Sequence, residues 1–494
     1  MNAQNTTTAR PLLSLDADTS AALLSWIGEH GDRWRAKLTT AWVTASAPGP
    51  LHALRNRTED SAAVMALPED PDEARAALAA PEPEPAEPAA DSFRGRVNAG
   101  ALARALKVAQ RVAPRQSQRP ALESVHLETA GRGLSIRATD LEVEHVQRLP
   151  IEFGGGGGSA RINPRTVGAW AATLDADAAL DVEMHACRDG GGPHTGSLAT
   201  PDGADRIEVH GADVDEFPVP MRADGPGFTA GEYALRDAIE AASATVSKKQ
   251  GRYATHGALL LVEDGGAKLV GTDESRLTLA TVEGAEAGDA RARAIVPLAA
   301  LKLALARLDK RPARGGSERA VTVTIETGAR TANGIVALDF GEESIRCRSI
   351  EGDFPRYSAV IPHETRSTLA ASADVLGRSV KRAASVTPKD APGVKFAPVL
   401  APGDSVEGAQ VQGRSTTGGT VRSAIDSATW TDADARTEFA LNPDYLADAL
   451  RVLAVGDRGA TVRVGVNDRT SPVRLESDAR PGVVVVIMPI TIDL

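Results

Sequence analysis

The residues of this chain with the clearest chemical use are regularly spaced cations. In the stretch NAGALARALKVAQRVAPRQ, basic residues recur at intervals of three or four: Arg104, Lys107, Arg111 and Arg115. On a helix this spacing gathers side chains on one face, and apolar residues such as Leu102 and Leu106 fall on another. No acidic residue occurs between Arg94 and Leu122. The stripe suits contacts with phosphate groups, although a solvated helix surface carries the same pattern.

The basic stripe has one counterpart further along the chain and one poor match. The stretch ADVLGRSVKRAASV repeats the spacing with Arg378 and Lys381, followed by Lys389. In the stretch between them, acidic residues occupy the helix and the nearby cations are bunched: Lys248, Lys249 and Arg252. If repeated units turn the same helix toward a common centre, an acidic protein gains a basic lining. Such a lining suits the backbone of a nucleic acid without base reading.

Enzymatic chemistry finds little support in the sequence. The chain lacks the Gly-Lys-Ser/Thr of a phosphate-binding loop and the Gly-x-Ser-x-Gly of a nucleophile elbow, and HETRS at His363 has no second histidine for zinc. Asp140 and Asp273 each follow a threonine, as in a structural turn. Five scattered histidines favour ordinary surface or half-buried positions over metal binding: His126, His145, His185, His210 and His256. We predict no catalytic residue, metal or cofactor.

Composition restricts the class of protein. A chain of 494 residues requires three or four domains at roughly 100 to 200 residues each. The formal net charge of −11 argues against a generally cationic nucleic-acid binder but says nothing about local distribution. Cys187 and Cys347 offer neither a disulfide framework nor a metal-binding pair. The N-terminal stretch lacks the regions of a secretory signal, so we expect a cytoplasmic protein.

The chain changes character after its first ninety residues. Residues 1–79 contain two weakly helical stretches and form an N-terminal extension of unknown function. Residues 80–93 contain PEPEPAEPAAD, which is typical of an extended, self-repelling linker. From Arg94 onward, single helices alternate with runs of short strands and turn residues, which indicates an α+β chain.

The α+β region repeats itself. RPALESVHLETAGRGLSIRATDLEVEHV, from Arg119, aligns with RYATHGALLLVEDGGAKLVGTDESRLTLATV, from Arg252, and in both a Thr-Asp pair separates two strands. The segments DEFPVP and GDFPRYSAVIP mark the ends of two such units. A third unit fits the remainder of the chain. We therefore predict domains at residues 94–220, 226–363 and 367–494.

The chain ends on an apolar run, PGVVVVIMPITIDL. The run is far shorter than the roughly 20 residues of a membrane-spanning helix, and a proline interrupts it. Consecutive valines favour a strand. We predict an ordinary core strand for Val483 to Val485 and a partly exposed binding surface for Met488, Pro489 and Ile490.

Taken in order, these motifs resemble the family of the bacterial DNA polymerase III β subunit, the replicative sliding clamp. The motifs that carry the resemblance are RPALESVHLE with LSIRATDLEVE, DEFP, RYATHGALLLVE with LVGTDESRLTLA, IVPLAALKLALARL, EGDFPRYSAVIP, FALNPDYLADALRVL and the terminal VVIMPI. The resemblance implies three tandem clamp domains and a head-to-tail homodimer that encircles duplex DNA, with helices inside and antiparallel sheets outside. It implies a non-catalytic processivity factor, working at the nucleoid, that tethers DNA polymerase and clamp-loader subunits through short linear peptides.

The resemblance also assigns two sets of site residues. The DNA-binding set combines the basic stripes with the cations near the start of the repeats: Arg104, Lys107, Arg111, Arg115, Arg119, Lys248, Lys249, Arg252, Tyr253, Arg378 and Lys381. The peptide groove lies between the second and third domains and matches Thr272, Arg276, Leu277, Pro355, Val360, Asn442, Tyr445, Val486, Ile487, Met488, Pro489 and Ile490.

Several positions depart from the family pattern. The family commonly has Gly-His where this chain has Glu274 and Ser275, and often an arginine where it has Ala359. These departures put the preferred partner peptide in question. We take TGSLAT, which offers only Leu198, as the edge that meets the next subunit, and FGGGGGSA as a flexible loop. Two alternatives stay open: a divergent second clamp with a specialised partner, and a multi-domain enzyme with an unrecognised site.

Overall fold

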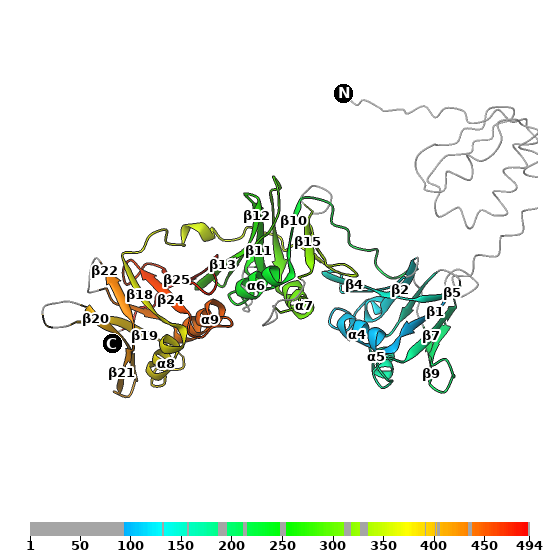
Figure 1. Ribbon diagram of the computed structural model, residues 1–494, viewed down its shortest axis with the longest axis horizontal. Coiled ribbons are helices and arrows are strands. Elements are labelled where there is room, and N and C mark those ends of the chain that lie inside the picture. Colours follow the sequence, from blue (N-terminus) through cyan, green and yellow to red (C-terminus); the bar gives the residue numbers. More distant parts are fainter. Residues whose placement is uncertain are drawn as a thin grey trace, which may run out of the picture. The chain divides into compact units, whose positions relative to one another are not determined.

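The computed structural model describes residues 93–492, except 131–132, 156–157, 186–194, 211–214, 248–252, 311–317, 327–333, 391, 401, 403–405 and 433–436. The chain divides into two units, Met1–Ala90 and Asp91–Leu494. The predicted N-terminal extension and nearly all of its linker lie outside the described residues. The helices and strands of the described residues belong to the second unit (Figure 1).

The first domain begins with a strand and a helix. Its elements are β1 (Phe93–Asn98), α4 (Ala99–Ala109), η1 (Pro120–Glu123), β2 (Val125–Ala130), β3 (Gly133–Thr139), β4 (Val143–Pro150), β5 (Glu152–Gly155), β6 (Ser159–Ile162), α5 (Pro164–Ala171), β7 (Ala179–His185), β8 (Thr195–Ala199) and β9 (Arg206–His210). Helix α4 begins where the Asn98 side chain accepts a hydrogen bond from the Ala101 N–H at 2.8 Å. Strands β5 and β6 flank the predicted glycine loop, because β5 pairs with β1 and β6 with β2; residues 156–157 between them lie outside the described residues.

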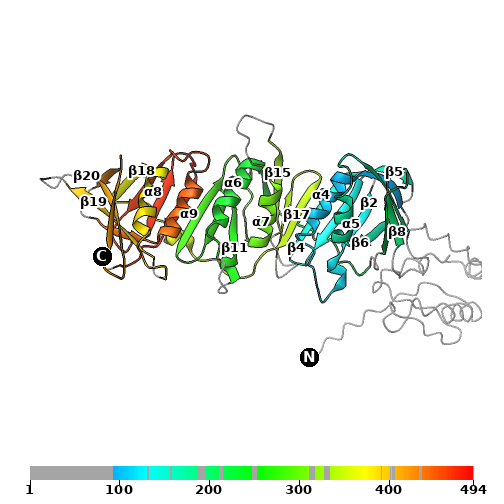
Figure 2. The ribbon, with the colours of Figure 1, turned by 90° about the horizontal axis from the view of Figure 1, so that it is seen from below.

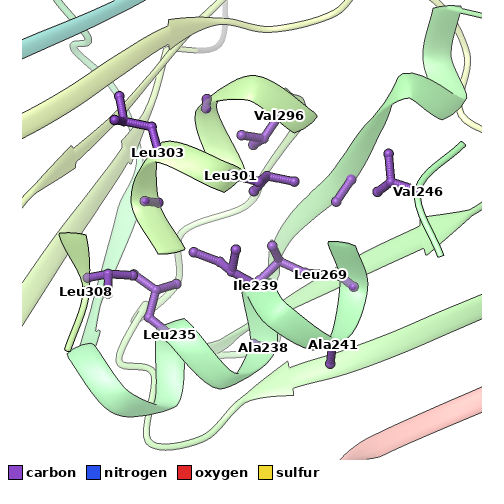
Figure 3. Packing of buried hydrophobic residues seen from close by; sticks show 14 of the residues in the cluster. Leu235, Ala238, Ile239, Ala241, Val246, Leu269, Val296, Leu301, Leu303 and Leu308 are labelled. Carbon is purple, nitrogen blue, oxygen red and sulfur yellow. The ribbon is translucent and has the colours of Figure 1, made fainter. Parts of the chain in front are cut away.

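The second domain repeats this order. Its elements are β10 (Gly227–Gly231), α6 (Glu232–Ser243), η2 (Tyr253–His256), β11 (Gly257–Glu263), β12 (Gly266–Thr272), β13 (Arg276–Val282), β14 (Ala292–Pro297), α7 (Leu298–Arg307), β15 (Ala320–Ile325), β16 (Ile335–Asp339) and β17 (Glu343–Arg348). Apolar side chains of α6, α7 and β12 gather in one cluster between the helices and the sheets (Figure 3). Burial of this apolar area is the main stabilising contribution to the domain.

The third domain follows the short helix η3 (Tyr357–Ala359). Its elements are β18 (Ser367–Ser372), α8 (Ala373–Ala384), β19 (Val394–Leu400), β20 (Val406–Arg414), β21 (Thr420–Ile425), β22 (Thr429–Asp432), β23 (Phe439–Leu441), α9 (Pro443–Leu453), β24 (Thr461–Val466), β25 (Val473–Ser477) and β26 (Val483–Ile487). The order of strand, helix, three-stranded meander, one or two further strands, helix and three final strands is therefore common to all three domains. The predicted α+β class with tandem domains is confirmed, and Figure 2 looks onto the side of this unit that carries α4 to α9.

The repeated Thr-Asp pairs form the same turn in two domains. In the first, Thr139 donates to the Val143 carbonyl at 3.0 Å, and Asp140 accepts from the Val143 N–H at 2.7 Å. In the second, Thr272 donates to the Arg276 carbonyl at 2.8 Å, and Asp273 accepts from the Arg276 N–H at 3.1 Å. Each turn places its third residue at positive φ, 79° for Leu141 and 73° for Glu274. The prediction of a structural turn is confirmed.

The sheets continue from one domain into the next. Strand β4 of the first domain pairs with β17, the last strand of the second, within an eight-stranded sheet. Strand β13 of the second domain pairs with β26, the last strand of the third, within a nine-stranded sheet. At both junctions, the third strand of a meander meets the final strand of the following domain. The third meander strand of the last domain, β21, and the final strand of the first domain, β9, are sheet edges.

The terminal valine run is strand β26, and its two faces have different surroundings. Val483, Val485 and Ile487 pack into the main core. Val486 lies on the opposite face, in a second apolar cluster with Leu277, its register partner on β13. The buried part of the run therefore extends two residues beyond the predicted core strand, since Val486 and Ile487 are only 2% and 0% exposed.

The first junction buries charge where the second junction buries apolar groups. Glu144 on β4 is fully buried and accepts hydrogen bonds from Arg137 at 3.3 Å and from Arg346 at 3.2 Å. Glu343 on β17 is also buried and accepts two hydrogen bonds from Arg307. A buried carboxylate is tolerated only with such partners, because desolvation of an unpaired charge is costly.

Candidate partner groove and basic helix surface

The basic residues of the first domain lie on an exposed surface. Arg104 and Lys107 project from α4, while the apolar residues of the same helix are buried. The helix ends at Ala109, earlier than the spacing predicts, and the N–H groups of Arg111 and Val112 instead bond the carbonyls of Val108 and Ala109 in tight turns. Arg111, Arg115 and Arg119 therefore lie in the following turns, where they are also exposed.

These five cations have no ion-pair partner among the residues that the structure describes. The turns that carry three of them are held by Arg165 at the start of α5. Arg165 donates to the carbonyls of Ala113 at 2.7 Å and Pro114 at 3.2 Å. The cations are thus free to meet anions, and their backbone is fixed by the adjacent helix.

The third domain presents fewer free cations. Helix α8 begins where the Ser372 side chain accepts a hydrogen bond from the Val375 N–H. Arg378 is exposed but forms an ion pair with Asp374 one turn earlier on the same helix. Lys381 is exposed, and no ion pair joins it to another described residue. The two predicted cations therefore share the helix surface, and one is already partly neutralised.

The second domain leaves the prediction largely untested. Lys248, Lys249 and Arg252 lie outside the described residues. Tyr253 begins η2, and the structure does not describe its side chain. Sequence reasoning missed Lys302, an exposed residue of α7. The only indication of Lys302 in the sequence was its position on α7, opposite the apolar residues of that helix.

One set of predicted groove residues lies at the Thr-Asp turn of the second domain. Thr272 is buried and closes the turn, so its hydroxyl is already bonded. Leu277 is 4% exposed and faces Val486 across β13 and β26. The segment between the second and third domains covers this face, because Phe354 and Tyr357 pack partly buried against the same cluster. Pro355 lies between them and is half-buried.

Helix α9 contributes the second set. Asn442 is its N-cap, and its side-chain oxygen accepts a hydrogen bond from the Asp444 N–H at 2.9 Å. Tyr445, in the first turn of the helix, lies under the Arg276 guanidinium, whose carbon is 4.4 Å from the ring centroid. Arg276 also donates to Asp448 at 2.6 Å. The turn of the second domain and α9 of the third domain are thus joined side chain to side chain.

The terminal residues after β26 form the third set. Met488 donates its N–H to the Ser275 carbonyl at 2.9 Å, and Ile490 donates to the Ala440 carbonyl at 2.9 Å. The chain therefore runs from the Thr-Asp turn to β23 of the third domain. Met488 is 38% exposed, and Pro489 and Ile490 are half-buried. Val360, after η3, is 39% exposed.

The structure brings the predicted groove residues to one junction, with two qualifications. Val486 is buried on the face of β26 that it shares with Leu277, whereas Ile487 is buried on the opposite face, in the main core. Sequence reasoning missed Asp448, whose only sequence signal was a position one helical turn after Tyr445.

The described ranges contain neither a membrane-spanning helix nor a metal-binding cluster. None of their helices combines the length and apolar character needed to cross a membrane. No group of three or more histidine, cysteine or acidic side chains in those ranges has the arrangement of a metal site.

Comparisons with known proteins agree with the geometry. Residues 95–220 match the sequence model of a family described as DNA polymerase III beta subunit, N-terminal domain. The Beta sliding clamp of Caulobacter vibrioides strain NA1000 is 26% identical over 413 residues, which cover 80% of this chain and 99% of that relative. The Beta sliding clamp of Pseudomonas aeruginosa is 27% identical over 265 residues, 53% of this chain and 66% of the relative. The match thus spans slightly less than two thirds of the Pseudomonas protein.

Solved structures share the fold. The DNA polymerase III subunit beta from Pseudomonas aeruginosa has a TM-score of 0.69 at 20% identity, over 81% of this chain and 100% of that chain. The DNA polymerase sliding clamp from Bacillus subtilis has a TM-score of 0.67 at 17% identity, with the same coverage. Three repeated domains with sheets continuous across their junctions define the DNA-clamp fold. Over residues 95–220 this chain matches the DNA polymerase III beta subunit family, and over most of its length it is similar to Beta sliding clamps.

Proposed function

We propose that this chain is a DNA sliding clamp, a non-catalytic processivity factor that encircles duplex DNA and tethers a DNA polymerase and other partners. The observation that carries the proposal is the pair of equivalent junctions, at which β4 meets β17 and β13 meets β26. At each junction, the third meander strand of one domain pairs with the final strand of the following domain. The chain therefore leaves β21 at one end and β9 at the other as unpaired sheet edges. Closure onto a second copy then produces a ring, and a ring on DNA can slide but cannot step off sideways.

The same rule predicts the interface of a head-to-tail homodimer. Strand β21 of one copy is expected to pair antiparallel with β9 of the next. The predicted edge at TGSLAT is replaced in this proposal, because that segment is β8 and lies between β7 and β9. Glu144 opposes Arg346 at the first junction and Leu277 opposes Val486 at the second. The equivalent positions of β21 and β9 are Thr420 and Glu208.

Cross-linking tests this interface. In a chain whose native cysteines are replaced by serine, Thr420→Cys and Glu208→Cys should form a disulfide between copies, because directly opposed strand residues lie within disulfide reach. Thr420→Cys with Ile207→Cys is the matched control, since Ile207 points to the other face. A species of dimer mass is expected only for the first pair. Equal cross-linking of both pairs, or of neither, contradicts the interface.

The DNA contacts proposed for this ring are phosphate contacts. The support is the row of exposed cations on and after α4, together with Lys381 on α8. Because phosphates repeat regardless of sequence, binding should be independent of base sequence and weaken with salt. Lys248, Lys249 and Arg252 stay predictions of the same kind. We also propose that the protein works in the cytoplasm, at the nucleoid.

The ring itself has a direct test. The protein is loaded by a matching clamp loader onto a nicked circular plasmid, which is then linearised with a restriction enzyme. A topological ring is retained on the circle and slides off the free ends. Equal retention before and after cutting would refute encirclement, and loss from both forms in moderate salt would do the same.

Partners are proposed to bind the groove residues through short peptides with apolar anchors. The support is the exposure of Val360 and Met488 beside the covered cluster of Leu277 and Val486. Deleting residues 488–494 should abolish binding of a Gln-x-x-Leu-Phe peptide, measured by calorimetry. The chain should stay folded and keep its oligomeric state in solution. Full-strength binding by the truncated protein would contradict the groove. Glu274, Ser275 and Ala359 leave the peptide preference to be measured.

A further inference from the structure

The Arg276 side chain joins two domains at the groove residues. Its Nε donates to Asp273 Oδ2 at 3.0 Å, within the Thr-Asp turn. Its Nη1 donates to Asp448 Oδ2 at 2.6 Å, on helix α9 of the next domain. Its guanidinium lies over the Tyr445 ring. Burial opposes the charge of Arg276, but the hydrogen bonds to Asp448 and Asp273 outweigh it and raise its pKa.

The turn does not need this arginine. The first domain builds the same Thr-Asp turn, with the same hydrogen bonds and the same positive φ. There the position of Arg276 is occupied by Val143, which is buried and carries no charge. Because the first domain forms the turn without an arginine, we infer that Arg276 has a different role in the second domain.

The junction does not need the arginine either. Strands β13 and β26 are hydrogen-bonded along their length. Arg480 adds a second connection, because it donates to the carbonyls of Val452 at 2.8 Å and Asp237 at 2.7 Å. These contacts hold the two domains together from the sheet and from the helices. The Arg276 side chain acts instead between the Thr-Asp turn and the start of α9.

We propose that Asp448 is a positioning residue, which fixes Arg276 over Tyr445 and thereby sets the separation of the two walls of the peptide groove. The inference rests on the proposed function, since it presumes that the groove binds a peptide. The walls are the Thr-Asp turn with Met488 on one side and the first turns of α9 on the other. If the walls are already held in position, less conformational entropy is lost when the peptide binds, so affinity rises without a new contact.

The same geometry limits what Arg276 itself can bind. Its Nε and Nη1 are both occupied by carboxylates, and its charge is compensated by Asp273 and Asp448. The side chain is 12% exposed. We therefore expect the partner to bind this part of the groove by apolar contact with the walls, and not through a carboxylate of its own paired to Arg276.

The test measures peptide affinity and stability in parallel. The full chain with Asp448→Asn is titrated with a Gln-x-x-Leu-Phe peptide by calorimetry, and its melting temperature and mass are recorded. We expect affinity to fall about tenfold with the melting temperature nearly unchanged. Asp448→Glu should recover part of the loss. The matched control is Arg451→Gln, which removes the other ion-pair partner of Asp448, an arginine that is 72% exposed.

A double substitution separates positioning from general damage. If Asp448 acts only through Arg276, adding Asp448→Asn to Arg276→Gln should lower the affinity no further. Additive losses would overturn the proposal. So would a loss in the Arg451→Gln control equal to that of Asp448→Asn, or a large fall in melting temperature. If the unaltered chain binds no such peptide, the proposed function fails; if it binds and Asp448→Asn binds equally well, only the positioning role fails.

Discussion

The buried carboxylate of Glu343 gives the first domain junction a defined pH dependence. Its Oε1 lies 2.7 Å from His145 Nε2 on β4, across the junction. Arg307 on α7 donates to the same carboxylate from Nε at 2.5 Å and from Nη2 at 2.8 Å. Burial opposes ionisation of Glu343, but the hydrogen bonds from His145 and Arg307 outweigh it and lower its pKa to about 2, from an ordinary value of 4.5.

The sign and size of the effect depend on this difference in pKa. Because the pKa is lower in the folded state, ionised Glu343 stabilises the fold above its unfolded pKa, and this contribution is lost as pH falls toward about 2. Between pH 6 and pH 3.5, protonation is favoured in the unfolded chain but scarcely in the folded one. The loss over this interval is about 1.4 kcal/mol, which corresponds to about a tenfold change in an opening equilibrium.

Hydrogen exchange of the β4 and β17 amides measures this equilibrium at the junction. Glu343→Gln removes the titrating group and keeps the shape of the side chain. We expect the wild-type chain to be better protected than Glu343→Gln at pH 6. At pH 3.5 the advantage should be about tenfold smaller, after correction for intrinsic exchange rates.

A constant advantage at both pH values would refute the assignment, because it would mean that Glu343 does not change its charge differently in the folded and unfolded chains. Glu342→Gln provides the control. Glu342 is the exposed neighbour of Glu343, so its replacement should leave both protection and its pH dependence as in the wild type.

Two further predictions concern the DNA surface and the end of the chain. Replacing Arg104, Lys107 and Arg111 by glutamine should reduce the steepness of log affinity for primed DNA against log salt by about 2.7, since three fewer counterions are released. The control Lys268→Gln, which changes a cation on β12, should leave the slope unaltered. The same slope in the wild type, the triple variant and the control would count against the basic surface. Ile487→Ala should lower the stability by about 3 kcal/mol, whereas Met488→Ala should cost less than about 0.5 kcal/mol, because only Ile487 is fully buried. Thermal melting compares the two, and equal costs would mean that the strand does not end between them.

Local patterns in the sequence were sufficient for much of the fold. The Thr-Asp pairs encode their turn through neighbouring side chains and backbone, so Thr139 and Thr272 predict the same hydrogen bonds wherever they occur. The alternation of apolar and basic residues around Arg104 and Lys107 fixes which helix face is buried. The β-branched run predicts a terminal strand. Each of these depends on residues close together in the chain.

Errors in the sequence-based predictions arose where a single distant residue decides the outcome. Burial of Val486 and Ile487 depends on the strand that pairs with them, which belongs to the preceding domain.

The sequence by itself determined the order of the elements, the repeated units and the cations on the first helix, because these follow from periodicity and local hydrogen bonding. Only the tertiary structure decided which strand is an edge, since β8 and β9 are both five-residue strands and differ in their neighbours. It also decided that Asp448 meets Arg276 and that Glu343 is buried against Arg307. These contacts join residues far apart in the chain, and no local pattern specifies the partner of a charge; packing of one domain against the next does.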